Sequence, residues 1–231
     1  MAPYQLLNDA AAQVSWKPVI IAGGFSFAAG FVDGNTNVRF QAFGGMMTGN
    51  AAYLGISIAS GPTLKSCLYI ALLASFALGA VIASEVLKRH SVSKARGMMG
   101  LLMFVLLIAT DALDEVVIRS SVRQAYRRFA VLFSAVAMGV QNVSSMKEKA
   151  LQQNTTIFTG NLQKLSEVFH RVLRGETKHE DPQLGVQLGL SLLIYIFGAT
   201  VGVLAIDVLG PWSLWPAAAI QLCALVGLAA I

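Results

Sequence analysis

The stretch Leu184–Ile206 reads LGVQLGLSLLIYIFGATVGVLAI and contains no charged residue. An α-helix crosses the hydrocarbon core of a bilayer in about 20 predominantly apolar residues, so this stretch predicts a transmembrane helix. Leu64–Leu87 and Leu209–Ile231 are two further apolar runs that are long enough to span. The chain is therefore expected to be all-α, a polytopic membrane helix bundle.

The composition supports a membrane protein. Of the 231 residues, 55% are hydrophobic and only 13% are charged, whereas soluble domains carry about 25% charged residues. The formal net charge of +5 could indicate nucleic-acid binding. However, the basic residues form short clusters between apolar runs, as loop charges do in membrane proteins, and no basic motif interleaved with aromatic residues appears. The lipid bilayer is the predicted partner, and no nucleic acid is expected.

The two halves of the chain repeat a pair of short motifs. Gly30–Asp33 (GFVD) is followed by Met47–Asn50 (MTGN), and Gly139–Asn142 (GVQN) is followed by Phe158–Asn161 (FTGN). The order and the approximate spacing are kept, and a self-similar arrangement of this kind is the sequence signature of an internal repeat. Two related halves are therefore predicted.

The repeat defines the expected domain organisation: an N-terminal interfacial segment at residues 1–16, a first membrane repeat at 17–118 and a second at 119–231. Phe76–Ala80 and Tyr195–Ala199 are similar segments further along each half. If each half has three crossings plus a shorter motif helix, the halves are inverted, because three is odd. The alternative counts each motif helix as a crossing, which gives eight spans and parallel repeats.

Loop charges test these topologies, because cytoplasmic loops carry an excess of Lys and Arg. With six crossings, the more basic side holds Lys17, Lys88, Arg89, Lys94, Arg96, Lys147, Lys149, Lys164, Arg171, Arg174 and Lys178. The other side holds Arg39, Lys65, Arg119, Arg123, Arg127 and Arg128. The excess favours a multi-pass protein with both termini in the cytoplasm.

Each Thr-Gly-Asn motif is expected to lie at a helix break. The glycines around Gly34–Asn37 and Gly44–Gly49 make an unbroken helix unfavourable there. Thr48 would then cap the next helix, whose N-terminus attracts anions or polar groups. Two such breaks across a pseudo-two-fold axis form the midplane site of inverted-repeat transporters. The predicted solute-binding residues are Thr48, Gly49, Asn50, Gln141, Asn142, Thr159, Gly160 and Asn161.

Acidic residues supply a further hypothesis. Asp33 ends the first apolar run, and an acid at membrane depth is a functional candidate because it is costly to bury. It is predicted to bind a proton or a cation and to couple transport; the alternative is an interfacial residue that pairs with Arg39 or caps the break. Asp111, Asp114 and Glu115 are interpreted as a solvated boundary at the end of a span.

The quoted motifs, with their flanks Ala29–Asp33, Ala137–Asn142 and Thr156–Asn161, resemble those of the YoaK-type membrane protein family. That family is a domain of unknown function with about six predicted spans, and the similarity extends from Lys17 to the C-terminus. The resemblance implies a membrane protein of this fold and supplies no substrate.

Two function hypotheses follow from the sequence. One is a transporter or channel for a small polar or anionic solute. The other is a non-transporting scaffold or partner-binding subunit, whose Thr-Gly-Asn motifs only pack helices. No hydrolase, zinc or phosphate-loop motif appears, so no enzyme, metal site or cofactor is expected, and the Gly-rich faces would suit a homo-oligomer.

Overall fold

Long apolar helices make up most of the chain in the computed structural model, which describes residues 15–61, 63–120, 124–147, 158–176 and 181–229. The long helices in these ranges are α2 (Trp16–Phe40), α4 (Thr63–Arg89), α5 (Val92–Arg119), α7 (Val131–Lys147), α9 (Asp181–Leu209) and α10 (Trp215–Ala229). The remaining elements are α3 (Met47–Ser60), α6 (Gln124–Arg127), α8 (Phe158–Arg174) and the 3₁₀ turns η1 (Arg128–Ala130) and η2 (Gly210–Trp212). The described residues contain no strand, which confirms the predicted all-α helix bundle.

Three helical stretches in these ranges are both long and apolar enough to span a membrane: Leu64–Arg89, Arg128–Lys147 and Asp181–Trp212. α9 alone has 29 residues, which corresponds to about 44 Å and exceeds the roughly 30 Å of the hydrocarbon core. Several large apolar side chains in its C-terminal half face outward; Phe197 is 61% exposed and Val208 82%. Large apolar side chains exposed along one face of a long apolar helix are typical of a surface covered by lipid, so the fold is that of a membrane protein.

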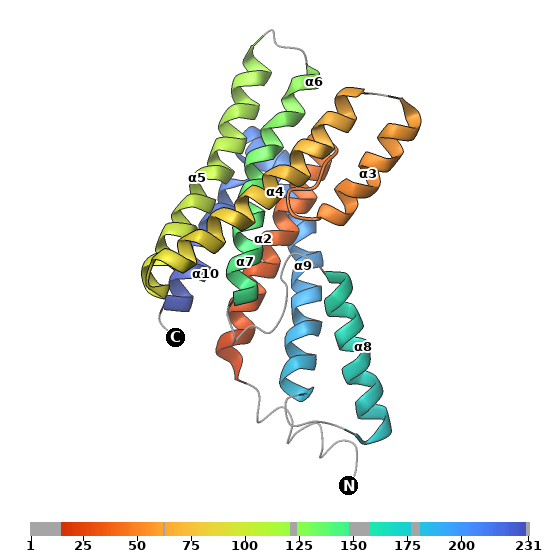
Figure 1. Ribbon diagram of the computed structural model, residues 1–231, viewed down its shortest axis with the longest axis vertical. Coiled ribbons are helices and arrows are strands. Elements are labelled where there is room, and N and C mark those ends of the chain that lie inside the picture. The colour runs from red at the N-terminus through yellow and green to blue at the C-terminus, as the bar shows by residue number, and fades with distance from the viewer. Residues whose placement is uncertain (1–14, 62, 121–123, 148–157, 177–180, 230–231) are drawn as a thin grey trace.

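The bundle is organised as helix pairs. α2 packs along α9, α4 along α7, and α5 along α10. The two short motif helices lie on different pairs, because α3 packs on α4 and α8 packs on α9. Figure 1 shows that α2 and α7 run in opposite directions, with α3 toward one end of the molecule and α8 toward the other.

Glycines allow two of these pairs to approach to backbone contact. A Cβ on Gly30 of α2 would lie 2.0 Å from the carbonyl oxygen of Tyr195 in α9, and a Cβ on Gly139 of α7 would lie 2.1 Å from that of Phe76 in α4. Only residues without a side chain fit such contacts, which is the usual reason for glycine between membrane helices. Gly30 and Gly139 hold the same position in the repeated sequence motifs, and so do Tyr195 and Phe76.

The expected end of the first helix was wrong. α2 does not break at Gly34–Asn37 but continues to Phe40, and the break lies at residues 41–46. Gly34 is needed for packing rather than for a turn, since a Cβ there would lie 2.4 Å from the carbonyl oxygen of Ala199. Asn35 also faces the protein interior, where its amide donates to the carbonyl of Gly202 at 2.9 Å and to Ser213 Oγ at 2.8 Å. Polar residues that bond to neighbouring helices are compatible with an unbroken membrane helix.

The interfacial segment predicted for residues 1–16 lies outside the described residues except for its last two positions. The boundary between the predicted repeats at residues 118 and 119 falls in the last turn of α5, before the short elements α6 and η1. The repeat organisation and its inversion stay predictions.

Candidate functional site

The loop of residues 41–46 turns the chain back on itself between α2 and α3. Gln41 ends α2 in the left-handed region, at φ 55°, and its N–H donates to the carbonyl of Asn37. The next N–H groups are bonded by side chains: Phe43 donates to Asn50 Oδ1 at 3.0 Å and Gly44 to Thr36 Oγ1 at 2.9 Å. Irregular backbone at membrane depth needs such partners because no bulk water is present to replace them.

Asp33 supplies the partners for the rest of the loop. Its Oδ1 accepts hydrogen bonds from the N–H of Gly45 at 2.6 Å and of Met46 at 3.1 Å, and its Oδ2 accepts one from the Tyr195 hydroxyl at 2.8 Å. The carboxylate lies in front of the N-terminus of α3, where the helix dipole favours negative charge. Asp33 is only 2% exposed. The sequence suggested two structural roles for Asp33, pairing with Arg39 or capping the helix break. These contacts are those of a residue that caps the break.

Two local expectations about this loop are corrected. Thr48 does not cap α3, because its side chain is exposed, the residue at the cap position is Met46, and Asp33 from α2 takes the capping role. Asp33 does not pair with Arg39, whose guanidinium contacts other acids. Both errors arise because the partner of a loop N–H comes from a neighbouring helix rather than from the next residues along the chain.

The other two residues of the first motif hold the loop in place. Asn50 is fully buried and bonds both backbone groups of Phe43, since its Nδ2 donates to the Phe43 carbonyl at 2.7 Å in addition to the bond that Oδ1 accepts. Gly49 packs under the ring of Phe43, which a Cβ would approach to 2.8 Å. In the described contacts, Asn50 thus bonds its own loop.

Gln141 lies where α2, α7 and α10 meet. Its Nε2 donates to the carbonyl of Phe25 at 3.1 Å, and its Oε1 accepts from Gln221 Nε2 at 2.7 Å. Met138, one turn earlier in α7, lies close to both Gln221 and the loop: its Sδ is 3.5 Å from Gln221 Nε2, and its Cε would be 3.2 Å from a Cβ on Gly45. A continuous set of contacts therefore joins Asp33 to Gln141.

The second motif is described only in part. Gly160 is exposed and Asn161 is buried in the first turn of α8, and Asn142 lies almost buried in α7. The side chain of Thr159 lies outside the described residues. Of the predicted site residues, the described contacts therefore join Asp33 and Gln141.

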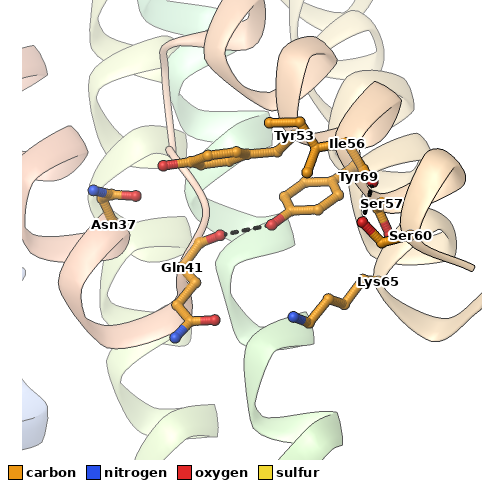
Figure 2. A pocket seen from close by; sticks show the side chains of 8 residues that line it. All are labelled: Asn37, Gln41, Tyr53, Ile56, Ser57, Ser60, Lys65 and Tyr69. Atoms are coloured by element: carbon orange, nitrogen blue, oxygen red, sulfur yellow. Dashed lines mark hydrogen bonds between the residues drawn. The ribbon is translucent and has the colours of Figure 1, made fainter. Parts of the chain in front are cut away.

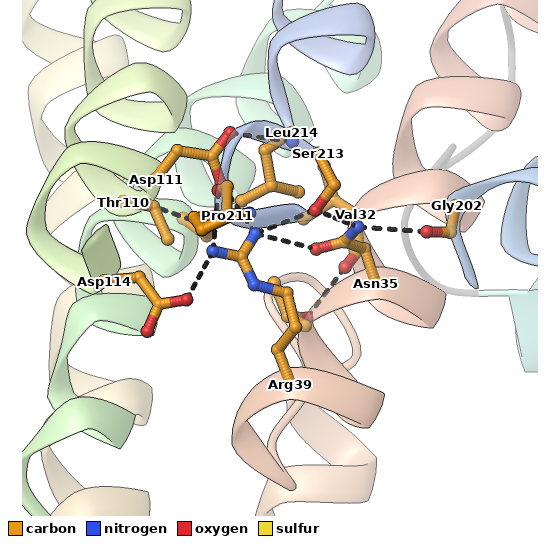
Figure 3. A network of polar contacts seen from close by, with 12 residues as sticks. Val32, Asn35, Arg39, Thr110, Asp111, Asp114, Gly202, Pro211, Ser213 and Leu214 are labelled. Carbon is orange, nitrogen blue, oxygen red and sulfur yellow. Dashed lines mark hydrogen bonds and ion pairs between the residues drawn. The ribbon is translucent and has the colours of Figure 1, made fainter. Parts of the chain in front are cut away.

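A buried network of charges lies beside the first loop (Figure 3). Arg39 of α2 donates to Asp111 at 2.6 Å and to Asp114 at 2.7 Å, and also to Ser213 Oγ and to the carbonyl of Pro211. Arg127 pairs with the same Asp114. Both carboxylates have no exposed surface, so the interpretation of Asp111 and Asp114 as a solvated boundary was wrong. Glu115, partly exposed beside Arg119, is the member of that group near the surface.

No local sequence pattern indicates this network, because residues 72 positions apart supply its opposite charges. Hydropathy treats Arg39, Asp111 and Asp114 as helix ends. The network instead connects α2, α5, α6 and the η2 turn. A buried ion pair of this kind contributes little net stability, but it becomes costly as soon as one partner is removed.

A pocket of about 370 Å³ opens on the other side of α2. Figure 2 shows the residues that line it, which come from the C-terminal end of α2, from α3 and from the start of α4. They are Asn37, Gln41, Tyr53, Ile56, Ser57, Ser60, Lys65 and Tyr69. None of them was predicted as a site residue. The one available sequence signal was Lys65, a cation at the start of an apolar span.

Residues 21–227 match the model of a family described as "Protein of unknown function (DUF1275)". The chain belongs to the DUF1275 family. The match begins within α2 and ends within α10, so membership in a family of unknown function is confirmed, while the YoaK-type name stays a resemblance. No curated protein and no solved structure matches this DUF1275 chain.

The described part of the DUF1275 chain contains no group of three or more His, Cys, Asp or Glu side chains placed to hold a metal ion. The polar features that the described residues provide are the Asp33 carboxylate at the loop, Gln141 and Gln221 between the helices, and the pocket beside α3.

Proposed function

We propose that this DUF1275 protein carries a small polar or anionic solute across a membrane, as a transporter or channel built from two inverted repeats with six crossings and two motif helices. The observation that carries the proposal is the pair of matching glycine contacts, Gly30 on Tyr195 and Gly139 on Phe76. If the two halves are related as the repeated motifs predict, these contacts are equivalent helix crossings, which supports the proposal. Inverted repeats of this kind build transporter sites near the bilayer midplane.

The loop of residues 41–46 supports the same proposal. A broken segment followed by a short helix is how transporters present helix N-termini to a solute. Here Asp33 bonds the start of α3 to α2 and α9 at once. Protonation of Asp33 would remove its negative charge and weaken the bonds from Gly45, Met46 and Tyr195. The carboxylate is therefore placed so that a proton could release α3, which is the coupling role expected from the sequence.

Gln141 and Gln221 add a second line of support. Oε1 of Gln221 is buried and has no hydrogen-bond partner within the described residues. A buried acceptor without a partner costs about 1–3 kcal/mol, and a polar solute beside it would supply the missing donor. This acceptor lies next to Gln141, a predicted solute-binding residue, and the contacts through Met138 connect it to the Asp33 loop.

One observation favours the scaffold as a second candidate. Asn50 and Asp33 use their polar atoms to hold the loop, so the first motif also has a purely structural explanation. α8 would then provide the partner surface, because Phe169, Val172 and Leu173 are exposed on one side and cations lie on the other. In this reading the protein binds a partner and moves no solute.

The experiment that separates the candidates is solute-evoked current from purified protein in liposomes on a solid-supported membrane. Organic anions, amino acids, sugars and nucleobases would be applied in turn, with and without a proton gradient. A transporter gives a saturable current for one class of solute, and Asp33→Asn removes its dependence on pH. Asp207→Asn is the matched control, because Asp207 is an exposed acid in α9.

A silent panel from folded protein would favour the scaffold. If the currents of Asp33→Asn and of the parent protein had the same pH profile, the protein would still be a transporter, but Asp33 would not couple transport to protons.

A further inference from the structure

The pocket between α2, α3 and α4 has an uncompensated positive charge. Lys65 lines it and has no carboxylate partner among the described residues. Arg128 of η1 is close enough to the Tyr69 hydroxyl to interact with it electrostatically, and it too has no acidic partner in the described ranges. Asp111 and Asp114, the buried acids on the other side of α2, are bonded to Arg39 and Arg127.

The pocket also offers hydrogen-bond donors that nothing else in the described structure uses. The side-chain amides of Asn37 and Gln41 line it, and no hydrogen bond to another described group engages them. Tyr69 donates its own hydrogen to the carbonyl of Gln41 at 2.9 Å, which fixes the wall next to these amides. Figure 2 shows the Gln41 amide and the Lys65 amine at the same end of the pocket. Amide and ammonium donors converging on one end are suited to a carboxylate or phosphate oxygen.

Aromatic rings form the opposite wall. Tyr53 stacks on Phe43 with ring centroids 5.8 Å apart and planes 6° apart, and it lies 5.6 Å from the ring of Tyr69. The stacked pair holds the Tyr53 ring in place, so the wall is formed before any ligand arrives. A flat or ring-shaped organic body could lie against this wall while its anionic group reaches Lys65. The lining of apolar rings with a few placed polar groups is characteristic of small-molecule sites.

We propose that this pocket binds an organic anion that carries one carboxylate or phosphate group on a ring-sized body, with Lys65 as the cation that holds the anionic group. That this anion is the transported solute rests on the proposed function. Binding of the anion in the pocket does not depend on transport. The same anionic chemistry is present in a free metabolite and in an anionic lipid headgroup, so the test has to separate these two sources.

Calorimetric titration of the detergent-purified protein tests the charge requirement with matched probes. Benzoate and benzamide share one shape but differ in charge, and glycerol 3-phosphate supplies the phosphate. Benzoate or glycerol 3-phosphate is expected to bind and benzamide is not. If neither anionic probe binds at millimolar concentration to folded protein, or if benzamide binds as well as benzoate, the proposal is overturned.

Variants locate the site. Lys65→Ala should weaken binding about tenfold or more, equivalent to about 1.4 kcal/mol, while Lys65→Arg retains it. Ser60→Trp should block the pocket sterically; among the described residues, the hydroxyl of Ser60 bonds only to Ile56 of its own helix, so folding is expected to be kept. Lys88→Ala is the matched control, because Lys88 is an exposed cation at the other end of α4. Equal affinities in Lys65→Ala and Lys88→Ala would place the anion elsewhere and reject the pocket.

Two further experiments separate binding of a lipid headgroup from transport of a solute. Titration in nanodiscs of phosphatidylcholine, with or without phosphatidylglycerol, identifies the source: competition by phosphatidylglycerol that Lys65→Ala abolishes would assign the site to a lipid headgroup and overturn its solute role. Flux of the bound anion into liposomes tests the proposed function. Binding that depends on Lys65 without any flux would support the anion site and contradict the proposed transport. Flux that is unchanged in Lys65→Ala would support transport and contradict a solute site at Lys65.

Discussion

The side chain of Asp33 connects three segments that are distant in the sequence: α2, the loop of residues 41–46, and α9. Its carboxylate receives two backbone N–H groups and the Tyr195 hydroxyl, and it is buried within a bundle whose surroundings are mostly apolar. Each of these donors would lose its partner if the carboxylate were absent. The stability of α3 on the bundle therefore depends strongly on this one residue.

Asp33→Ala is expected to lower the free energy of unfolding by about 3 kcal/mol, because each buried donor left without a partner costs about 1–3 kcal/mol. Asp33→Asn should cost roughly half as much, since its amide oxygen still accepts from the loop. Thermal unfolding of the purified variants in one detergent measures both. Asp207→Ala, at an exposed position of α9, should stay within about 0.5 kcal/mol of the parent. Equal stabilities of the Asp33 and Asp207 variants would show that the loop does not depend on the carboxylate.

For single residues, the sequence indicated which side chains are important more reliably than it indicated their contacts. It predicted Asp33, Asn50 and Gln141 as special, because polar residues inside apolar runs are costly and need a reason. It assigned the cap to Thr48 and a solvated role to Asp111, since local spacing carries no information on a partner in another helix. Three-dimensional packing alone brings Arg39 to Asp111.

The helices are assembled by close backbone crossings as well as by apolar packing. Lipid is as apolar as a leucine side chain, so membrane helices associate through van der Waals contact between small residues. Gly30, Gly198 and Gly202 serve the α2–α9 pair, and Gly79 and Gly139 serve the α4–α7 pair. Gly198 and Gly202 lie against the backbone of Phe27 and Phe31. The sequence misplaced the break in α2, because hydropathy does not show that Gly34 faces Ala199.

Gly30→Ala and Gly139→Ala are each expected to destabilise the protein by about 3 kcal/mol, at the upper end of overpacking costs, since the added methyl meets rigid backbone. Gly55→Ala is the matched control in α3, where a Cβ has open space, and it should be neutral or stabilising by up to about 1 kcal/mol. Thermal unfolding in detergent measures all three. If Gly139→Ala were tolerated while Gly30→Ala was not, the two crossings would not be equivalent, which would contradict an internal repeat.

For the molecule as a whole, chain direction and loop charge agree with each other. α2 and α7 run in opposite directions (Figure 1), as inverted halves require. The end that holds the α4–α5 turn and α8 also carries Lys88, Lys94 and Lys164, and the positive-inside rule predicts that such an end faces the cytoplasm. The bundle and its apolar spans were predictable because hydrophobicity sets them directly. The location of a pocket was not, because it depends on how α3 folds back against α4.

The six-crossing topology is tested by the accessibility of single cysteines, introduced into a variant in which Cys67 and Cys223 are replaced by Ala. Ser60→Cys, Ser93→Cys and Glu176→Cys all lie at exposed positions in or next to turns. With six crossings, positions 93 and 176 share one side of the membrane and position 60 lies on the other. With eight crossings, positions 60 and 176 share a side and position 93 is opposite. A membrane-impermeant maleimide applied to intact cells should label Ser60→Cys alone if both termini are cytoplasmic, whereas labelling of Ser93→Cys alone would establish the eight-span alternative with parallel halves.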